Sequence, residues 1–178
     1  MPMMRVTAPQ GALNFAQKKS LSEAFTDLLL IGEVGTTAPE ARKFVHILFQ
    51  ELDTLTDWFV GGHPRGLEPQ GAPPHFFLDV FYPHAAAPPS AKRQLHRALN
   101  NALVRVVLGE DTPPDALSNW IVIHEIDEGA WGVRGNSIGV TDIFRANQAS
   151  SDRLAYTTAF LAAETKLQTE FQFPRDLA

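Results

Sequence analysis

The chain has 178 residues, of which 44% are hydrophobic and 20% charged, and its formal net charge at pH 7 is -5. This length and composition fit a soluble globular protein, built as one ordinary domain or as two small fused units. The acidic balance provides no broad basic field, so we expect no nucleic acid or membrane partner. The absence of cysteine excludes disulfides, thiolate catalysis and thiolate metal sites.

The amino-terminal segment begins with a predicted strand at residues 3–8, which ends at Pro9-Gln10-Gly11. Asn14 and Gln17 then have the spacing of a capping box, which predicts the start of a helix. Apolar residues recur behind them at helical spacing, and two glycines close the helix. These residues are Leu21, Phe25, Leu28 and Leu29, followed by Gly32 and Gly35. Residues 44–52 then predict a buried strand.

The second half repeats this order of signals. Residues 75–83 and 119–126 predict strands, and an apolar stripe between them predicts a helix that ends at Gly109. Segment DTPPDAL corresponds to TTAPEAR of the first half. We therefore expect two strand-helix-strand repeats over residues 2–62 and 74–143, joined by a linker rich in Gly and Pro at 61–74. They would form one domain over residues 1–145, followed by a C-terminal helical tail over 146–178 with a helix near 151–169.

A glycine-rich stretch follows the second strand of each repeat, as ELDTLTDWFVGG at residues 51–62 and EIDEGAWGVRG at 125–135. A strand ending in Glu, a polar turn, an aromatic residue and close glycines resembles the tautomerase superfamily, in particular 4-oxalocrotonate tautomerase. Pro2, Gly11 and the helix start at Gln17 also stand where that family has them. The resemblance covers residues 2–143 and implies an α+β fold of the MIF type. In that fold, two β-α-β repeats form a four-stranded sheet with two helices on one face.

The resemblance also implies an assembly and a mechanism. Three chains would bring their sheets together as a homotrimer, and the chain would be an isomerase that needs no cofactor. Pro2, once Met1 is removed, would be the general base, because a free terminal amine has a pKa of about 7.7–8.0 that an apolar pocket lowers. Pro74 holds the equivalent place in the second repeat, but its nitrogen is an internal amide.

The family binds carboxylate substrates with arginines, and here the chain departs from the family pattern. Ala12 replaces one arginine, and the position of the second falls on His46 and Trp120, so a dicarboxylate is not the expected substrate. The candidate binding residues for a small carboxylate-bearing substrate are therefore His46, Trp131, Arg134, Trp120 and Trp58. The alternatives are a core histidine for His46, a solvated turn for Arg134 and subunit packing for the tryptophans.

Other kinds of site find no support in the sequence. The six histidines show no HxH or HxxxH spacing, which argues against a metal site. The apolar run at residues 28–31 is too short to span a bilayer, and no signal peptide precedes it, so we expect a cytoplasmic protein. Three alternatives stay open: a hydratase or dehalogenase of an unsaturated acid, a catalytically silent trimeric binding protein, and a ferredoxin-like binding module.

Overall fold

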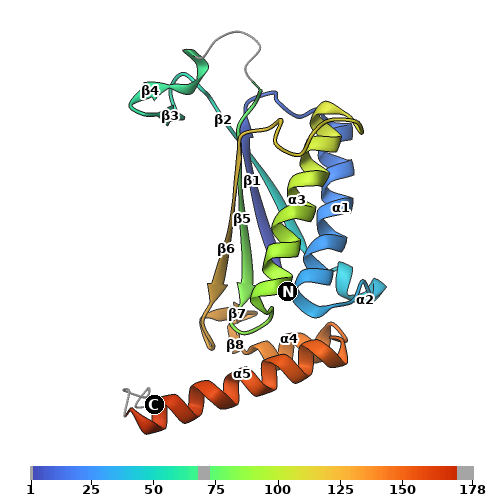
Figure 1. The fold of residues 1–178 in the computed structure, drawn as a ribbon, viewed down its shortest axis with the longest axis vertical. Helices are drawn as coiled ribbons and strands as arrows, with labels where there is room; N and C mark the ends of the chain where they lie inside the picture. Colours follow the sequence, from blue (N-terminus) through green and yellow to red (C-terminus); the bar gives the residue numbers. More distant parts are fainter. Residues whose placement is uncertain (1, 68–72, 172–178) are drawn as a thin grey trace.

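The computed structural model describes residues 2–67 and 73–171, and its centre is a four-stranded sheet in the order β2-β1-β5-β6 (Figure 1). Two long helices cover one face of this sheet, which confirms the predicted α+β fold. The elements of the first repeat are β1 (Met3–Pro9), α1 (Phe15–Val34), α2 (Pro39–Arg42), β2 (His46–Leu52), β3 (Phe59–Val60), β4 (His63–Pro64) and a 3-10 helix (Arg65–Leu67). Those that follow are β5 (Phe76–Pro83), α3 (Pro89–Leu108), β6 (Asn119–Ile126), β7 (Trp131–Val133), β8 (Asn136–Ile138), α4 (Val140–Ala146) and α5 (Ser151–Glu170).

The strand directions decide which residues meet at each end of the sheet. Within each repeat the two strands are parallel, β1 with β2 and β5 with β6. The two repeats join through β1 and β5, which are antiparallel, with Met3 opposite Phe81 and Thr7 opposite Phe77. The start of β1 therefore lies at the same end of the sheet as the end of β6, whereas the end of β2 lies at the opposite end.

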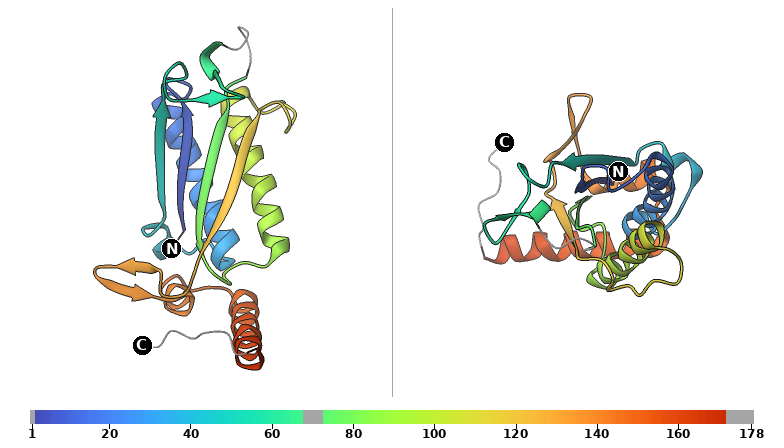
Figure 2. Two further views of the ribbon diagram at one scale, coloured as in Figure 1. Left: turned by 90° about the vertical axis from the view of Figure 1, so that its left-hand side faces the viewer. Right: turned by 90° about the horizontal axis from the view of Figure 1, so that it is seen from above.

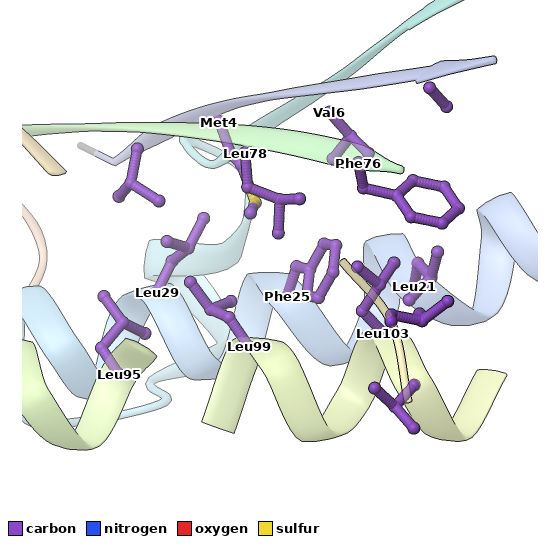
Figure 3. Close-up of a cluster of buried hydrophobic side chains, with 14 of the residues drawn as sticks. Met4, Val6, Leu21, Phe25, Leu29, Phe76, Leu78, Leu95, Leu99 and Leu103 are labelled. Carbon is purple, nitrogen blue, oxygen red and sulfur yellow. The ribbon is translucent and has the colours of Figure 1, made fainter. Parts of the chain in front are cut away.

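The main core fills the layer between the sheet and the two helices (Figure 3). On the helix side it contains the predicted stripe of α1, namely Leu21, Phe25 and Leu29, each with 0% exposure. Equivalent leucines of α3 and alternate residues of the central strands complete it, because side chains repeat every 3.6 residues on a helix and every two on a strand. These are Leu95, Leu99, Leu103, Met4, Val6, Leu78 and Val80.

Helix α1 shows how local sequence sets its ends. Asn14 and Gln17 form the predicted capping box, in which each side chain accepts a hydrogen bond from the other residue's backbone N–H. The helix continues through Gly32, where the sequence predicted a stop, and ends at Val34. Gly35 then takes a left-handed conformation, with φ of 72°, and its N–H reaches back to the carbonyls of Leu30 and Ile31.

The second face of the sheet carries no helix, and this corrects the predicted buried strand at residues 44–52. Strand β2 begins at His46, and its side chains are exposed or half-buried, with Leu48 50% exposed. It is an edge strand, so it has a neighbour on one side only, and one of its faces is uncovered in the single chain. Apolar residues on both faces therefore do not mean burial on both faces in the monomer.

The C-terminal part forms a layer below one end of the sheet (Figures 1 and 2). Helix α5 corresponds to the helix predicted near 151–169, whereas α4 was not predicted and spans the expected boundary at residue 145. Its three buried apolar residues, Val140, Ile143 and Phe144, are too few to show a helical period in the sequence. Within residues 2–67 and 73–171, none of the helices has the length and apolar character needed to cross a bilayer.

Candidate active site

A pocket of about 340 Å³ opens where β1 begins and β6 ends. Its walls come from four places in the sequence: the start of β1, the approach to β2, the end of β5 and the segment from β6 into β7. The lining residues are Pro2, Met3, Phe44, His46, Phe81, Ile126, Ala130, Trp131 and Gly132. The pocket thus combines residues of both repeats, because the antiparallel β1–β5 pair brings the end of the second repeat to the start of the first.

Pro2 and His46 are neighbours in this pocket. Pro2 is buried, and its carbonyl accepts a hydrogen bond from the His46 backbone N–H at 3.4 Å. Met3 of β1 pairs with His46 of β2 on one side and with Phe81 of β5 on the other. His46, Met3 and Phe81 therefore form one row across the uncovered face of the sheet, beside Pro2.

Trp131 reaches the pocket from the hairpin β7–β8, which forms a two-stranded sheet of its own. Arg134 and Gly135 make the turn of this hairpin, with φ of 53° and 82°. Positive φ at both central residues is the geometry of a tight hairpin turn, and it explains the glycine next to Arg134. Trp131 pairs with Ile138 at the open end of the hairpin, so its side chain belongs to the part nearest the sheet.

Phe81 is held on the pocket wall by a second pair of residues. Its ring stacks on the His124 ring at 4.9 Å between centroids, and His124 Nε2 lies 2.7 Å from an Asp79 carboxylate oxygen. All three side chains share the uncovered face of the sheet. His124 is therefore a support for Phe81 and does not itself line the pocket.

Comparison with solved structures places this geometry in a known fold, although no protein-family model and no curated protein matches the sequence. A fused 4-OT, solved as an asymmetric trimer, is 21% identical, with 76% of this chain and 94% of that chain covered and a TM-score of 0.56. The protein N1, a member of the cis-3-chloroacrylic acid dehalogenase family, is 17% identical over 76% and 82% of the two chains, with a TM-score of 0.56. The macrophage migration inhibitory factor of Toxoplasma gondii is 12% identical over 76% and 99%, with a TM-score of 0.54. The chain has the fold of the tautomerase superfamily.

Within this tautomerase fold, three of the predicted site residues come together and three do not. Pro2, His46 and Trp131 share the pocket. Trp58 lies just before β3, and Trp120 lies near the start of β6 opposite Phe77, so both belong to the opposite end of the sheet. That end is about 20 Å away, the length of a seven-residue strand. Arg134 is exposed at the hairpin tip and is outside the lining.

The other pocket residues are not among those predicted from the sequence, although some of them carry a recognisable signal. Met3 and Phe81 could have been found from the strand register, had the antiparallel pairing of the repeats been known. Phe44 lies two residues before His46, in a segment that was assigned to the core. Ala130 and Gly132 flank the tryptophan that was selected.

The pocket is apolar, and two buried ionisable groups, Glu33 and Tyr82, lie at the same end of the fold outside its described lining. His46 is the only ionisable side chain among the nine described lining residues. At the same end of the tautomerase fold, in the last turn of α1, Glu33 is 0% exposed, and burial raises the pKa of its carboxyl. Burial, aided by the charge of Glu33, likewise raises the pKa of Tyr82, whose hydroxyl donates to the Leu29 carbonyl at 2.9 Å.

No group of three or more His, Asp or Glu side chains gathers as a metal site anywhere in residues 2–67 and 73–171. The pocket instead brings together buried Pro2, the neighbouring His46 imidazole and the aromatic ring of Trp131. An amine at Pro2 would act on a carbon held against Trp131 and Phe81, while the His46 imidazole could donate a hydrogen bond to an oxygen of the same ligand.

Proposed function

We propose that the chain is a cofactor-independent tautomerase or isomerase of a small oxo- or hydroxy-acid, with Pro2 as the general base. The observation that carries this proposal is the place of Pro2, buried in an apolar pocket beside His46 and Trp131. An apolar pocket disfavours a protonated amine, which lowers the pKa of a terminal Pro2 amine toward neutrality. A base of that strength is suited to taking a proton from a carbon beside a carbonyl.

The neighbouring side chains supply the remaining steps. Removal of the proton leaves an enolate oxygen, and a hydrogen bond from the His46 imidazole would stabilise the negative charge on it. The protonated Pro2 amine then returns the proton at another carbon, or at the oxygen in a keto–enol tautomerisation, which completes the isomerisation without a metal or a cofactor; ketonisation of an enol is the same pair of steps in reverse. Trp131 covers the ligand and excludes water, which keeps the enolate from being protonated at random.

The pocket also restricts the substrate. Since His46 is the only ionisable side chain in the described lining, one carboxylate can find a hydrogen-bonding partner there and a second one cannot. We therefore propose a monocarboxylate whose remaining part is apolar or aromatic and lies on Phe44, Phe81 and Trp131.

Homotrimer formation belongs to the same proposal. The uncovered face of the sheet exposes Leu48 by 50% and Trp120 by 67%. Exposed apolar patches of this kind mark interaction surfaces. Solved fused 4-OT structures include both asymmetric and symmetric trimers, and the present chain has the same fold with one face of its sheet uncovered. Three copies would cover this face and enclose the open side of the Pro2 pocket.

Intact mass is the first test, because the state of Met1 lies outside the described residues. A mass without Met1 keeps Pro2 available as an amine. A mass with Met1 in native material would refute Pro2 as the base, since its nitrogen would then be an amide. That result would favour the silent binding protein.

Kinetics with phenylenolpyruvate is the second test. Pro2→Ala replaces the rigid secondary amine of proline by a flexible primary amine, and it should lower kcat/KM by a part of the factor of about 10²–10⁴ that general acid–base catalysis contributes. Pro74→Ala is the matched control, because Pro74 holds the equivalent place in the second repeat and cannot supply an amine. Equal rates for wild type and Pro2→Ala would show that the proline ring is not needed, and equal rates for the protein with and without Met1 would remove the Pro2 amine from the mechanism.

The similarity to a member of a dehalogenase family supports a second candidate, hydration or dehalogenation of an unsaturated acid. This chemistry needs a group that activates water, and the described lining offers His46 but no carboxylate. Chloride release from 3-chloroacrylate isomers, with no turnover of phenylenolpyruvate, would favour this candidate over the tautomerase.

A further inference from the structure

The hairpin β7–β8 carries one wall of the pocket, but the main sheet does not hold it in place. Ala130, Trp131 and Gly132 line the pocket, and the two hairpin strands pair with each other as a separate two-stranded sheet. The hairpin leaves the fold at the end of β6 and returns to it at α4 (Figure 2). The position of the hairpin at the pocket of Pro2 therefore depends on how the end of β6 and the start of α4 are held.

The side chain of Glu128 joins the entry of the hairpin to the start of α4. Glu128 lies in the turn that enters the hairpin, and its Oε1 accepts a hydrogen bond at 2.9 Å from the backbone N–H of Val140, the first residue of α4. The first N–H groups of a helix have no partner within the helix, so the Val140 N–H is available to donate to Glu128. The bond joins the turn before the hairpin to the start of the helix after it.

Gly139 makes room for this bond. A Cβ atom at residue 139 would collide with Glu128 Oε2, so the carboxylate lies directly over the glycine backbone. The φ of Gly139 is -94°, which any residue can adopt. The glycine is therefore needed for the close approach of the carboxylate and not for its own conformation.

Helix α4 in turn is fixed to the body of the fold. Val140, Ile143 and Phe144 are at most 2% exposed, and they pack in a second core cluster with Leu30 and Val34 of α1. Ile138, the β8 residue opposite Trp131, packs against the same cluster.

Helix α5 extends this attachment. The Ser150 N–H donates to the Val34 carbonyl at 2.8 Å, and the Thr157 hydroxyl donates to the Ala85 carbonyl at 2.8 Å. The segment after the hairpin is thus immobilised at several points on α1 and on the turn between β5 and α3.

We propose that Glu128 and α4 form a latch that positions Trp131 over Pro2. The inference rests on the proposed function for its catalytic meaning, and on the contacts above for the latch itself. Glu128 is a positioning residue, since it acts on the ligand only through the hairpin. The segment after residue 139 thereby becomes part of the site without touching the ligand.

The test uses a parent variant with Trp58→Phe and Trp120→Phe, in which Trp131 is the only tryptophan. Acrylamide quenching of its fluorescence then reports the hairpin alone. Glu128→Ala, which removes the acceptor, and Gly139→Ala, which displaces the carboxylate, should both make Trp131 easier to quench. Glu128→Gln keeps an acceptor oxygen and should quench as the parent does. Asp127→Ala is the control, because it removes the neighbouring carboxylate and leaves the Glu128–Val140 bond.

Kinetics on phenylenolpyruvate separates positioning from a general loss of structure. Glu128→Ala should raise KM by up to about tenfold with kcat nearly unchanged, since Trp131 binds the ligand alike before and during proton transfer. A parent without turnover would refute the proposed function, and the quenching results would still decide the latch. Quenching of Glu128→Ala and Gly139→Ala equal to that of Asp127→Ala would overturn the latch, whatever the activity.

Discussion

The replacement of Gly32 by alanine is a sharp test of the core at the pocket end of the fold. Gly32 lies within α1 and faces α3 and β5. A Cβ atom there would collide with the Tyr82 hydroxyl oxygen and lie 3.2 Å from a Leu95 methyl carbon. Tyr82 is 1% exposed, and its hydroxyl is bound to the Leu29 carbonyl, so the ring has no free direction in which to move.

Three contributions set the expected size of the effect. Alanine favours the helix over glycine by about 1 kcal/mol. Overpacking costs about 1–3 kcal/mol, and displacement of the Tyr82 hydroxyl from the Leu29 carbonyl costs a further 1–3 kcal/mol or so. The central values give a net loss of about 3 kcal/mol in the free energy of unfolding, which for a chain of this size lowers Tm by roughly 6–12 °C.

The Tyr82→Phe variant removes the colliding atom, and it turns this prediction into a double-mutant cycle. Tyr82→Phe alone should cost about 1 kcal/mol, the net value of one hydrogen bond. The variant with both changes should be no less stable than Tyr82→Phe alone, because the new methyl group fills the space of the hydroxyl. The two changes should therefore couple by about 3 kcal/mol.

Urea and thermal unfolding at one fixed protein concentration measure these values, since assembly would make stability depend on concentration. A Gly32→Ala variant as stable as wild type would refute the close approach of α1 to Tyr82. A double variant no more stable than Gly32→Ala would refute Tyr82 as the cause of the collision.

Three further predictions concern charge, assembly and a helix end. Burial raises the pKa of the Glu33 carboxyl, so the folded state favours its protonated form. The free energy of unfolding therefore has its full value below the ordinary pKa of 4.5, and it falls as pH rises through the folded pKa. Glu33→Gln should therefore unfold at a higher temperature than wild type at pH 7 and at a similar temperature below pH 4.5. Trp120→Glu should shift the sedimentation of the assembly toward monomer, whereas Leu154→Glu, which changes an exposed residue on α5, should not. Asn14→Ala should cost about 1 kcal/mol and lower Tm by roughly 2–4 °C in a thermal melt, because it removes the capping box of α1.

The repeated plan of the fold could be predicted because its signals are local. Leu21, Phe25 and Leu29 recur at helical spacing, and Asn14 with Gln17 marks the helix start, so each repeat can be recognised without its neighbours. Local signals also indicate Pro2, which directly follows Met1, and Trp131, which lies in a glycine-rich hairpin sequence. Their meeting in one pocket followed from the family resemblance.

The residues that were misplaced depend on orientation, which no local pattern records. Trp58 and Trp131 stand at matching places in the two repeats, and so they seemed equivalent. Because β1 and β5 are antiparallel, the repeats point in opposite directions and the two hairpins lie at opposite ends of the sheet. The exposure of His46 has a similar cause, since apolar residues on both faces of a strand do not tell whether the second face is covered within one chain or by another.

The opposite orientation of the repeats also places Pro2 and Pro74 at opposite ends of the sheet. On the proposed function, a base can exist only at Pro2, because Pro74 is an internal residue at the other end. The hairpin that lines the pocket of Pro2 belongs to the second repeat, so the first repeat supplies Pro2 and His46 while the second supplies Trp131 and Phe81.

The two hairpins differ in the element that follows each of them. The hairpin β3–β4 runs on into the 3-10 helix at Arg65–Leu67, whereas β7–β8 runs on into α4, with the Glu128 carboxylate joining its two ends. Both hairpins are closed at their base, because the Gly66 N–H donates to the Thr54 carbonyl at 2.9 Å across β3–β4. On the proposed function, the Glu128 bond matters for activity because its hairpin supplies Trp131 to the pocket of Pro2, whereas Trp58 lies at the opposite end of the sheet.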